Sequence, residues 1–290
     1  MEAIKTAKCF CLFRRRIYNV RMKLSFKYPR VVIKFGPRLL WTFPKIAHNA
    51  KKATEKSLKS RYDLLRSLTL YLDRDMRLDV YTEGYEKLDM LENSGESLYI
   101  VSNHISDYDP IMTLRFFKRP LSFVAKEETK NYPFVGKAIA SIDGLFLPRK
   151  DLRASLTLMK ELEKRLTEKT SNYAIYPEGT RNKDPINTSV APFHPGSFKS
   201  AMRAKAIIVP MAIYGTFRVL DPGANGRRIP IEAAFLSPIY PKDYEGKTTE
   251  EIANLVHDEI DKKVTEFKKL DEEFYEKKLN KIPLSKGKIR

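Results

Sequence analysis

From residue 77 onward, short apolar runs alternate with longer amphipathic segments, and this alternation constrains the fold more than any other feature. Short runs bounded by Gly, Pro, Asn or charged residues are typical of buried strands, whereas apolar residues spaced three and four apart indicate helices. The alternation predicts an α/β domain whose mixed, largely parallel sheet is covered by helices on both faces. The expected strands are residues 77–82, 98–101, 121–125, 145–147, 173–176, 207–214 and 230–235, and the expected helices are residues 45–72, 110–117, 133–141, 152–168, 196–204 and 249–279.

The chain is therefore divided into three parts. Residues 1–75 form a basic helical segment, residues 76–246 the α/β domain, and residues 247–290 a charged C-terminal helix and tail. The chain of 290 residues, 42% hydrophobic and 31% charged, is long enough and apolar enough for a sizeable core. A loop is expected at residues 222–226, where Pro, Gly and Asn cluster.

The sequence argues against a membrane-spanning helix, a signal peptide and a disulfide-rich fold. No uncharged apolar run approaches the ~20 residues that a membrane-spanning helix needs, and the apolar run at residues 9–13 is too short for the core of a signal peptide. Cys9 and Cys11 are the only cysteines, and they are too close together for a disulfide framework. We therefore expect a cytoplasmic protein without a spanning helix.

The positive charge is concentrated at the N-terminus. Residues 1–60 hold 16 Lys or Arg against two acidic residues, a net charge of +14, out of +18 for the whole chain. A segment of this kind is attracted to a polyanion, which is either a nucleic acid or an anionic membrane face. The first alternative would make the chain a nucleic-acid-binding protein, but no zinc-ligand pattern or recognition motif accompanies the charge.

The membrane alternative is favoured by large apolar residues that recur at helical spacing within this basic segment. Pro37 and Pro44 predict two or three short helices instead of one. A helix lying in the headgroup plane combines such an apolar face with flanking basic and aromatic residues. A helical hairpin packed on the domain is the alternative. The expected apolar face is Val32, Phe35, Leu39, Phe43 and Ile46, and the flanking docking residues are Arg38, Trp41 and Lys45.

Residues 98–110 carry the first candidate for chemistry. A strand should end at Ser102, and Ser106 and Asp109 have the spacing of a helix capping box with Pro110 in the first turn. His104 then lies where a strand ends and a helix begins, which is a common place for catalytic groups in α/β folds. Asp109 could hold one imidazole nitrogen and leave the other free to accept a proton. The alternatives are a surface His beside a helix-capping Asp, or a metal site that would include Asp107, although no other His or Cys lies nearby to complete it.

Three further strand ends carry charged residues. Lys126, Arg149 and the turn at residues 178–181, Glu-Gly-Thr-Arg, each follow an expected strand. Gly179 allows the backbone to approach a ligand, and the planar guanidinium groups of Arg149 and Arg181 suit phosphate. Together with His104 and Asp109, these residues predict a proton acceptor beside an anion site.

Four blocks of residues, in order, resemble those of the glycerolipid acyltransferases, most closely the 1-acyl-sn-glycerol-3-phosphate acyltransferases. The blocks are Asn103-His104 with Asp109 (the HX4D motif), Gly144-x-Phe146 with Arg149, Tyr176-Pro177-Glu178-Gly179-Thr180-Arg181, and Ile208-Val209-Pro210. The resemblance covers about residues 76–240. Two positions depart from the family pattern: Pro148 stands where an acidic or amide residue is usual, and Tyr176 stands where Phe is more common.

The resemblance implies a glycerol-3-phosphate acyltransferase-like fold and an activity that yields phosphatidic acid at the cytoplasmic face of a membrane. It implies acyl-CoA or acyl-carrier protein as co-substrate, no cofactor, no metal and no covalent acyl-enzyme. The same fold could instead acylate glycerol-3-phosphate or another lysophospholipid. The roles that the resemblance implies are a general base for His104, its orientation for Asp109, and binding of lysophosphatidate for Lys126, Gly144, Arg149, Glu178, Gly179, Thr180 and Arg181.

Overall fold

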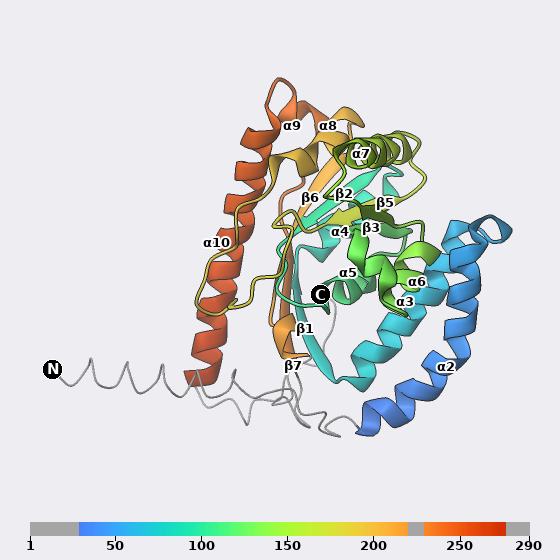
Figure 1. The fold of residues 1–290 in the computed structure, drawn as a ribbon. Coiled ribbons are helices and arrows are strands. Elements are labelled where there is room, and N and C mark those ends of the chain that lie inside the picture. Colours follow the sequence, from blue (N-terminus) through green and yellow to red (C-terminus); the bar gives the residue numbers. More distant parts are fainter. Residues whose placement is uncertain (1–28, 220–228, 277–290) are drawn as a thin grey trace.

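The computed structural model describes residues 29–219 and 229–276, and within them a seven-stranded sheet has the order β1-β7-β6-β2-β5-β3-β4 (Figure 1). Strand β7 is antiparallel to β6 and parallel to β1, and the other neighbouring pairs are parallel. The prediction of a mixed, largely parallel sheet is therefore confirmed. The strands are β1 (Leu78–Glu83), β2 (Leu98–Ser102), β3 (Leu121–Lys126), β4 (Leu145–Leu147), β5 (Asn172–Ile175), β6 (Ile207–Tyr214) and β7 (Ile229–Phe235).

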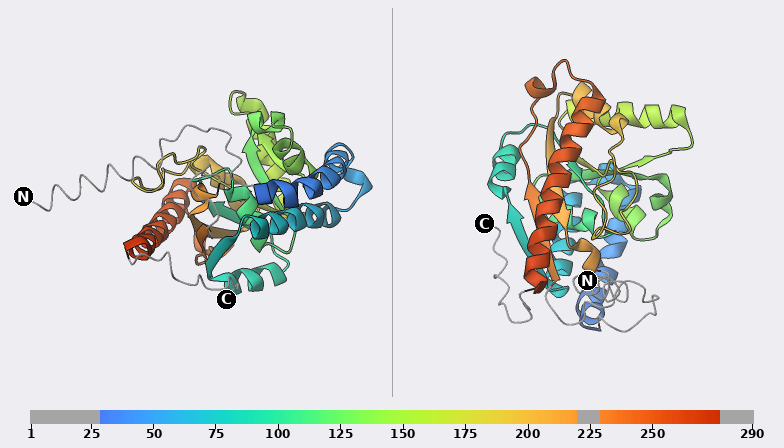
Figure 2. Two further views of the ribbon diagram at one scale, coloured as in Figure 1. Left: turned by 90° about the horizontal axis from the view of Figure 1, so that it is seen from below. Right: turned by 90° about the vertical axis from the view of Figure 1, so that its left-hand side faces the viewer.

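Helices cover both faces of the sheet (Figures 1 and 2). Strand β2 shows why: Leu98 and Ile100 belong to one buried cluster, whereas Tyr99 and Val101 belong to the other. The helices on the first side are α3 (Leu58–Asp75), α4 (Tyr85–Asn93), α5 (Asp109–Phe116) and α6 (Val135–Ser141), with α2 (Pro29–Lys51) outside α3 and α6. The second side has α7 (Leu152–Thr167), α8 (Lys199–Arg203) and α10 (Thr249–Glu276), and the short helix α9 (Pro241–Tyr244) precedes α10.

The helical boundaries before the sheet differ from the prediction. Helix α2 is continuous through Pro37 and Pro44, where two or three short helices were expected, and it bends along its length (Figure 1). A proline inside a helix bends or breaks it. Helix α2 packs against α3 and α6, and this packing keeps the helix continuous, so the prolines bend it without ending it. The single helix expected at 45–72 is also wrong, because α2 ends at Lys51 and α3 begins after Ser57. The Ser57 side chain caps α3 by accepting the N–H of Ser60 at 3.3 Å.

The face of α2 that was expected to enter the membrane instead packs on the domain. Ile46 is buried in the core, Phe35 and Leu39 pack against it, and the Phe43 ring lies 5.8 Å from that of Phe134. Packing on the domain removes the apolar surface of these large side chains from water, so they are stabilised without a membrane. Val32, the first residue of the predicted face, is an exception and is 67% exposed. The other exposed apolar residues of α2 lie on the opposite face. We define the outer stripe as Ile33, Pro37, Leu40, Trp41 and Pro44, all exposed and spaced at about one helical turn.

Other boundaries agree closely with expectation. Strands β4 and β6 begin and end at the predicted residues, whereas α4 was not predicted at all. The helix expected at 196–204 is divided into a 3-10 turn, Pro195–Phe198, followed by α8. The loop expected at 222–226, the cysteines and the last residues of the predicted C-terminal helix lie outside the described residues. Among the helices that are described, none has the length and apolarity required to cross a bilayer.

Candidate active site

Side chains that follow four strands of the sheet lie at one of its edges. Strand β2 leads to His104, β5 to Tyr176 and Glu178, β4 to Arg149 and β6 to Thr216. Strands β2, β4, β5 and β6 belong to the parallel part of the sheet, so their carboxyl ends lie at a common edge. This is the edge at which α/β folds place their ligand sites.

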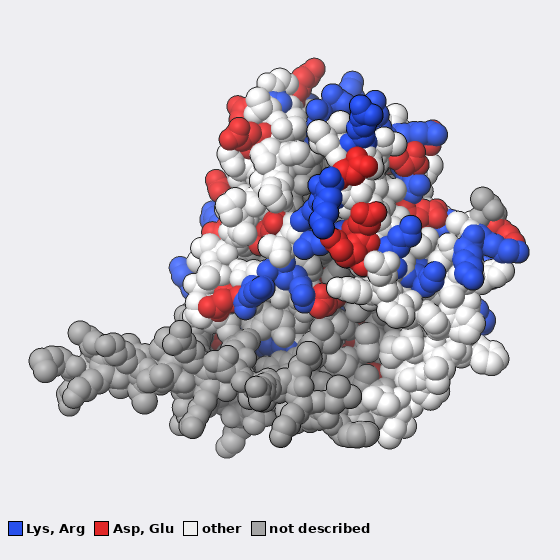
Figure 3. Space-filling model, in the orientation of Figure 1, with Lys and Arg blue, Asp and Glu red and all other residues white. Residues whose placement is uncertain are grey.

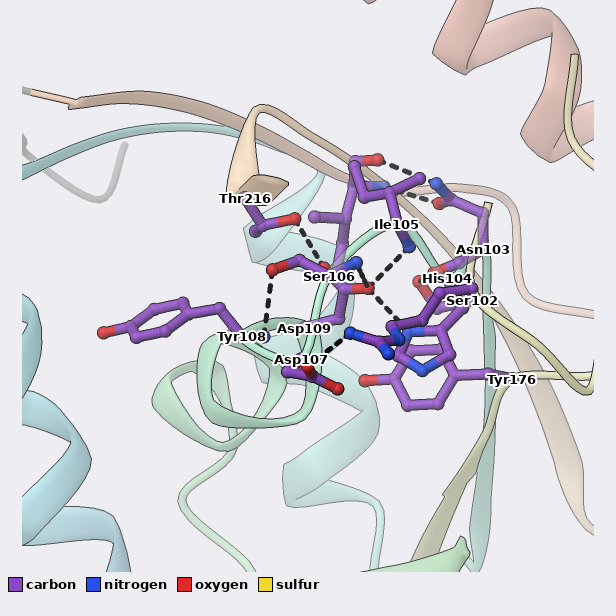
Figure 4. A network of polar contacts seen from close by, with 12 residues as sticks. Ser102, Asn103, His104, Ile105, Ser106, Asp107, Tyr108, Asp109, Tyr176 and Thr216 are labelled. Carbon is purple, nitrogen blue, oxygen red and sulfur yellow. Dashed lines mark hydrogen bonds and ion pairs between the residues drawn. The ribbon is translucent and has the colours of Figure 1, made fainter. Parts of the chain in front are cut away.

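His104 and Asp109 form the pair that the sequence predicts (Figure 4). The imidazole Nδ1 lies 2.7 Å from Asp109 Oδ2, and the same oxygen accepts the N–H groups of Ile105 at 2.7 Å and Ser106 at 2.8 Å. Asp109 Oδ1 accepts the hydroxyl of Thr216, and Asp109 and Thr216 are fully buried. The carboxylate thus accepts four hydrogen bonds, which fix it in position.

This arrangement sets the protonation of the imidazole ring. Because the carboxylate oxygens accept, Nδ1 carries the proton and donates to Asp109 Oδ2. Nε2 then holds a lone pair, and the His104 side chain is 19% exposed. The capping box is half formed, since Asp109 accepts the Ser106 N–H whereas the Ser106 hydroxyl accepts the N–H of Tyr108 at 3.1 Å.

Asn103 fixes the turn that carries His104. Its amide donates to the Ile213 carbonyl at 2.8 Å, and its side-chain oxygen accepts the Ile213 N–H at 2.9 Å. The two bonds imitate a backbone pair and extend the contact between β2 and β6 by one residue. Asn103 is fully buried, so it is a structural part of the site that substrate does not reach.

Glu178 holds main-chain groups, which is not the role that the resemblance implied. Its Oε1 accepts the His104 N–H at 2.5 Å and its Oε2 accepts the Ala191 N–H at 3.1 Å. Burial raises the pKa of Glu178 to about 7, and the two backbone hydrogen bonds oppose that rise. Glu178 therefore ties the His104 turn to the segment around Ala191, whereas the resemblance implied that it binds lysophosphatidate.

The residues expected to bind an anion lie at or just after the ends of β3, β4 and β5. Arg149 Nη1 donates to the Gly179 carbonyl at 2.9 Å, and Arg181 forms an ion pair with Asp107. Gly179 has φ +67°, a left-handed conformation that favours glycine, and a Cβ there would lie 2.8 Å from an Arg149 guanidinium nitrogen. Thr180, in the same turn, is exposed. Lys126 is also exposed, at the end of β3, and its register partner on β4 is Leu147, two residues before Arg149.

Gly144 is placed differently from its expected role in binding. A Cβ at Gly144 would lie 2.3 Å from Ile139 Cγ2, and the Gly144 N–H donates to the Ile139 carbonyl at 2.9 Å. The glycine permits a tight turn between α6 and β4, and this close packing is its function in the structure.

Part of this region is similar to a known protein family. The acyltransferase family model matches residues 80–214, slightly less than half of the 290 residues.

Three proteins that this chain resembles carry a common name. The protein is 28% identical over 173 residues to the 1-acyl-sn-glycerol-3-phosphate acyltransferase of Limnanthes douglasii, a match over 59% of this chain and 60% of the relative. The protein of that name from Haemophilus influenzae is 27% identical over 60% of this chain and 69% of its own length. The Saccharomyces cerevisiae protein of the same name is 31% identical over 58% and 56%. The chain thus spans less than two thirds of the Limnanthes douglasii and Saccharomyces cerevisiae proteins.

A solved structure has the same fold as this chain. The 1-acyl-sn-glycerophosphate (LPA) acyltransferase PlsC from Thermotoga maritima superposes with a TM-score of 0.59 and is 22% identical in sequence. The superposition covers 84% of this chain and 98% of that one. The shared fold therefore extends well beyond residues 80–214.

Two features of the candidate site were not found from the sequence. Thr216, which anchors Asp109, lies in the segment after β6 and is 107 residues away in the chain. The sequence offers only one indication of this role, which is that a small hydroxyl residue, Thr216, directly follows Gly215 at the end of a strand. The pairing of Asp107 with Arg181 was missed because two exposed side chains carry no periodic pattern.

Proposed function

We propose that the protein transfers an acyl chain from a thioester donor, either acyl-CoA or acyl-carrier protein, to the sn-2 hydroxyl of 1-acyl-glycerol-3-phosphate. His104 Nε2 accepts the hydroxyl proton as the oxygen attacks the thioester carbonyl. The new C–O bond forms, the C–S bond breaks, and the leaving thiolate takes the proton back from the imidazolium. Asp109 stabilises the imidazolium through the Nδ1 hydrogen bond, and no acyl-enzyme is needed.

The observation that carries this proposal is the buried Asp109 carboxylate, which holds Nδ1 of a partly exposed His104 beside two arginines. The test is an acyl-transfer assay that crosses lysophosphatidate and glycerol-3-phosphate with both donor types. Transfer to lysophosphatidate supports the proposal and identifies the donor. Transfer to glycerol-3-phosphate alone would overturn the acceptor assignment, and transfer to neither would overturn the activity.

We also propose that Arg181 and Arg149 bind the acceptor phosphate, with Asp107 as an internal competitor for Arg181. Arg181→Ala should raise KM for lysophosphatidate by roughly 10- to 100-fold, because one charge-assisted hydrogen bond is worth about 1.5–3 kcal/mol. Asp107→Asn should lower KM by a few-fold at most, because an exposed ion pair holds Arg181 with only ~0–1 kcal/mol. Steady-state kinetics with acceptor and donor varied separately measure both effects.

Arg203→Ala is the matched control for the phosphate proposal. Arg203 is an exposed arginine on α8 that pairs with Glu163 at 3.7 Å. Its replacement should leave both Michaelis constants unchanged. If Arg181→Ala and Arg149→Ala leave KM for the acceptor at the wild-type value, the phosphate binds elsewhere.

The outer stripe is proposed as the surface that meets the membrane, in place of the buried face predicted from the sequence. Leu40 is 78% exposed and Trp41 is 74% exposed. Lys45 lies over the Trp41 ring at 5.3 Å, so a basic group borders the stripe. Figure 3 shows the flank of the molecule at α2 as mostly uncharged. Arg38, by contrast, stacks on Tyr71 of α3 at 3.5 Å.

Leu40→Ser with Trp41→Ser should weaken binding to anionic phospholipid vesicles by about 100-fold or more, since two large apolar side chains together contribute at least ~3 kcal/mol on burial. Vesicle co-sedimentation measures the change. Met90→Ser with Leu255→Ser, which replaces exposed apolar residues on α4 and α10, is the control and should bind as wild type does. Equal binding of both double variants would assign docking to another surface. Deleting residues 1–60 is a poorer test because it removes Ile46 from the core.

A further inference from the structure

The Tyr176 ring lies against the His104 imidazole (Figure 4). The ring centroids are 4.5 Å apart and the planes are inclined by 25°, which is a stacked arrangement. Tyr176 directly follows β5, and the backbone of the His104 turn is tied to the same segment through Glu178. One face of the imidazole is therefore covered by an aromatic ring that comes from the neighbouring strand.

The tyrosine hydroxyl is part of a directed chain of hydrogen bonds. Thr113 Oγ1 donates to the main-chain carbonyl of Asp109 at 2.9 Å, because a carbonyl oxygen can only accept. With its proton used in this way, Thr113 Oγ1 accepts from the Tyr176 hydroxyl at 3.0 Å. The chain therefore runs from Tyr176 through Thr113, which is fully buried, to the residue that holds His104 Nδ1.

We propose that Tyr176 is a positioning residue for His104: its ring holds the imidazole in plane and stabilises the protonated ring, while its hydroxyl fixes the tyrosine through Thr113. The inference rests on the proposed function, in which His104 carries a positive charge during acyl transfer. An aromatic face attracts a cation, so the stack favours the imidazolium over the neutral ring. Burial and the nearby Asp109 carboxylate raise the pKa of Tyr176 well above its ordinary value, so the hydroxyl remains a donor.

The ring and the hydroxyl make separable contributions, and two variants distinguish them. Tyr176→Phe keeps the aromatic stack and leaves no orphaned donor, because Thr113 still donates to the Asp109 carbonyl. Tyr176→Leu removes the stack while filling the site with an apolar side chain. Tyr176→Leu should lower kcat about tenfold with KM for the acceptor changed less than threefold, whereas Tyr176→Phe should retain kcat within about threefold of wild type.

The dependence of kcat/KM on pH gives a second measurement. Without the aromatic face the imidazole loses its proton more readily, so the acidic limb of the profile for Tyr176→Leu should move to lower pH by about half a pH unit to one pH unit. The profile of Tyr176→Phe should superpose on that of the wild type. A Tyr176→Leu enzyme with the wild-type profile and kcat would overturn the proposal, and so would a Phe variant as impaired as the Leu variant.

Nitrogen NMR of ¹⁵N-histidine protein separates this proposal from the proposed function, because it requires no turnover. At alkaline pH all three proteins should show a protonated Nδ1 and an unprotonated Nε2 for His104, because Asp109 is intact. As the pH falls, Nε2 should become protonated at a lower pH in Tyr176→Leu than in wild type and Tyr176→Phe. His104→Gln assigns the resonances. If the chain transfers no acyl group, the signals still test the positioning. If transfer occurs and all three proteins give the wild-type signals, the positioning role is wrong.

Discussion

His104→Ala is expected to lower kcat by roughly 10²- to 10⁴-fold, the usual contribution of a general base. The side chain supplies the only proposed path for the acceptor proton, because Glu178 faces the backbone N–H groups of His104 and Ala191 and both Asp109 oxygens are occupied. The fold should be retained, since the turn is held by main-chain bonds at His104 and by the Asn103 side chain. Circular dichroism and thermal unfolding check that the variant is folded before turnover is compared.

His48→Ala is the matched control for this experiment. His48 is exposed at the end of α2, where its ring pairs with Glu55 at 2.9 Å, and its loss should leave transfer unchanged. A folded His104→Ala protein that turns over within a few-fold of wild type would rule out the general-base role of His104.

Asp109→Asn is expected to lower kcat by roughly 10²- to 10⁴-fold while reducing stability only modestly. The asparagine oxygen can replace Oδ2 and accept from His104, Ile105 and Ser106, while its amide faces the Thr216 oxygen, which can accept. The hydrogen-bonding shape is therefore mostly kept, and the lost quantity is the negative charge that stabilises the imidazolium. The displaced Thr216 proton should cost about 1–3 kcal/mol of unfolding free energy.

Kinetics and urea unfolding of the same protein preparation test both parts of that expectation. Asp63→Asn, which removes an exposed carboxylate paired with Lys59 on α3, is the control and should change neither kcat nor stability appreciably. An Asp109→Asn enzyme with wild-type kcat would show that the carboxylate charge has no part in the reaction. A variant that fails to fold would be replaced by Thr216→Val, which perturbs the same carboxylate from its other oxygen.

The sheet and the His104–Asp109 pair could be predicted from the sequence because both depend on local patterns. A fully buried strand such as β6 is a continuous apolar run, and a His that follows such a strand must lie at the edge of the sheet. Arg149 and Arg181, which are proposed to bind the acceptor phosphate, were picked out in the same way because each follows a strand. Strand β1 was also predicted, although its parallel partner β7 is about 150 residues away in the chain.

The features that were missed depend on contacts between distant segments. Helix α2 is apolar on two faces, and only the position of α3 and α6 decides that Ile46 is buried and Leu40 is exposed. Glu178 was assigned to substrate because the resemblance places it in the third block, whereas the folded chain brings two main-chain N–H groups to it. Periodicity within one segment carries no information about which neighbour covers it.

Helix α2 is held to the domain near both of its halves, by Arg38 on Tyr71 and by Phe43 against Phe134 with Ile46 below. Helix α2 is therefore fixed in position relative to the domain and does not act as a flexible linker. Under the docking proposal, the height of His104 above the plane of the bilayer is set when the chain folds. A lipid can react only if its free hydroxyl reaches the height of His104. Lipids whose hydroxyl lies at another depth are then excluded, whether or not a side chain recognises their headgroup.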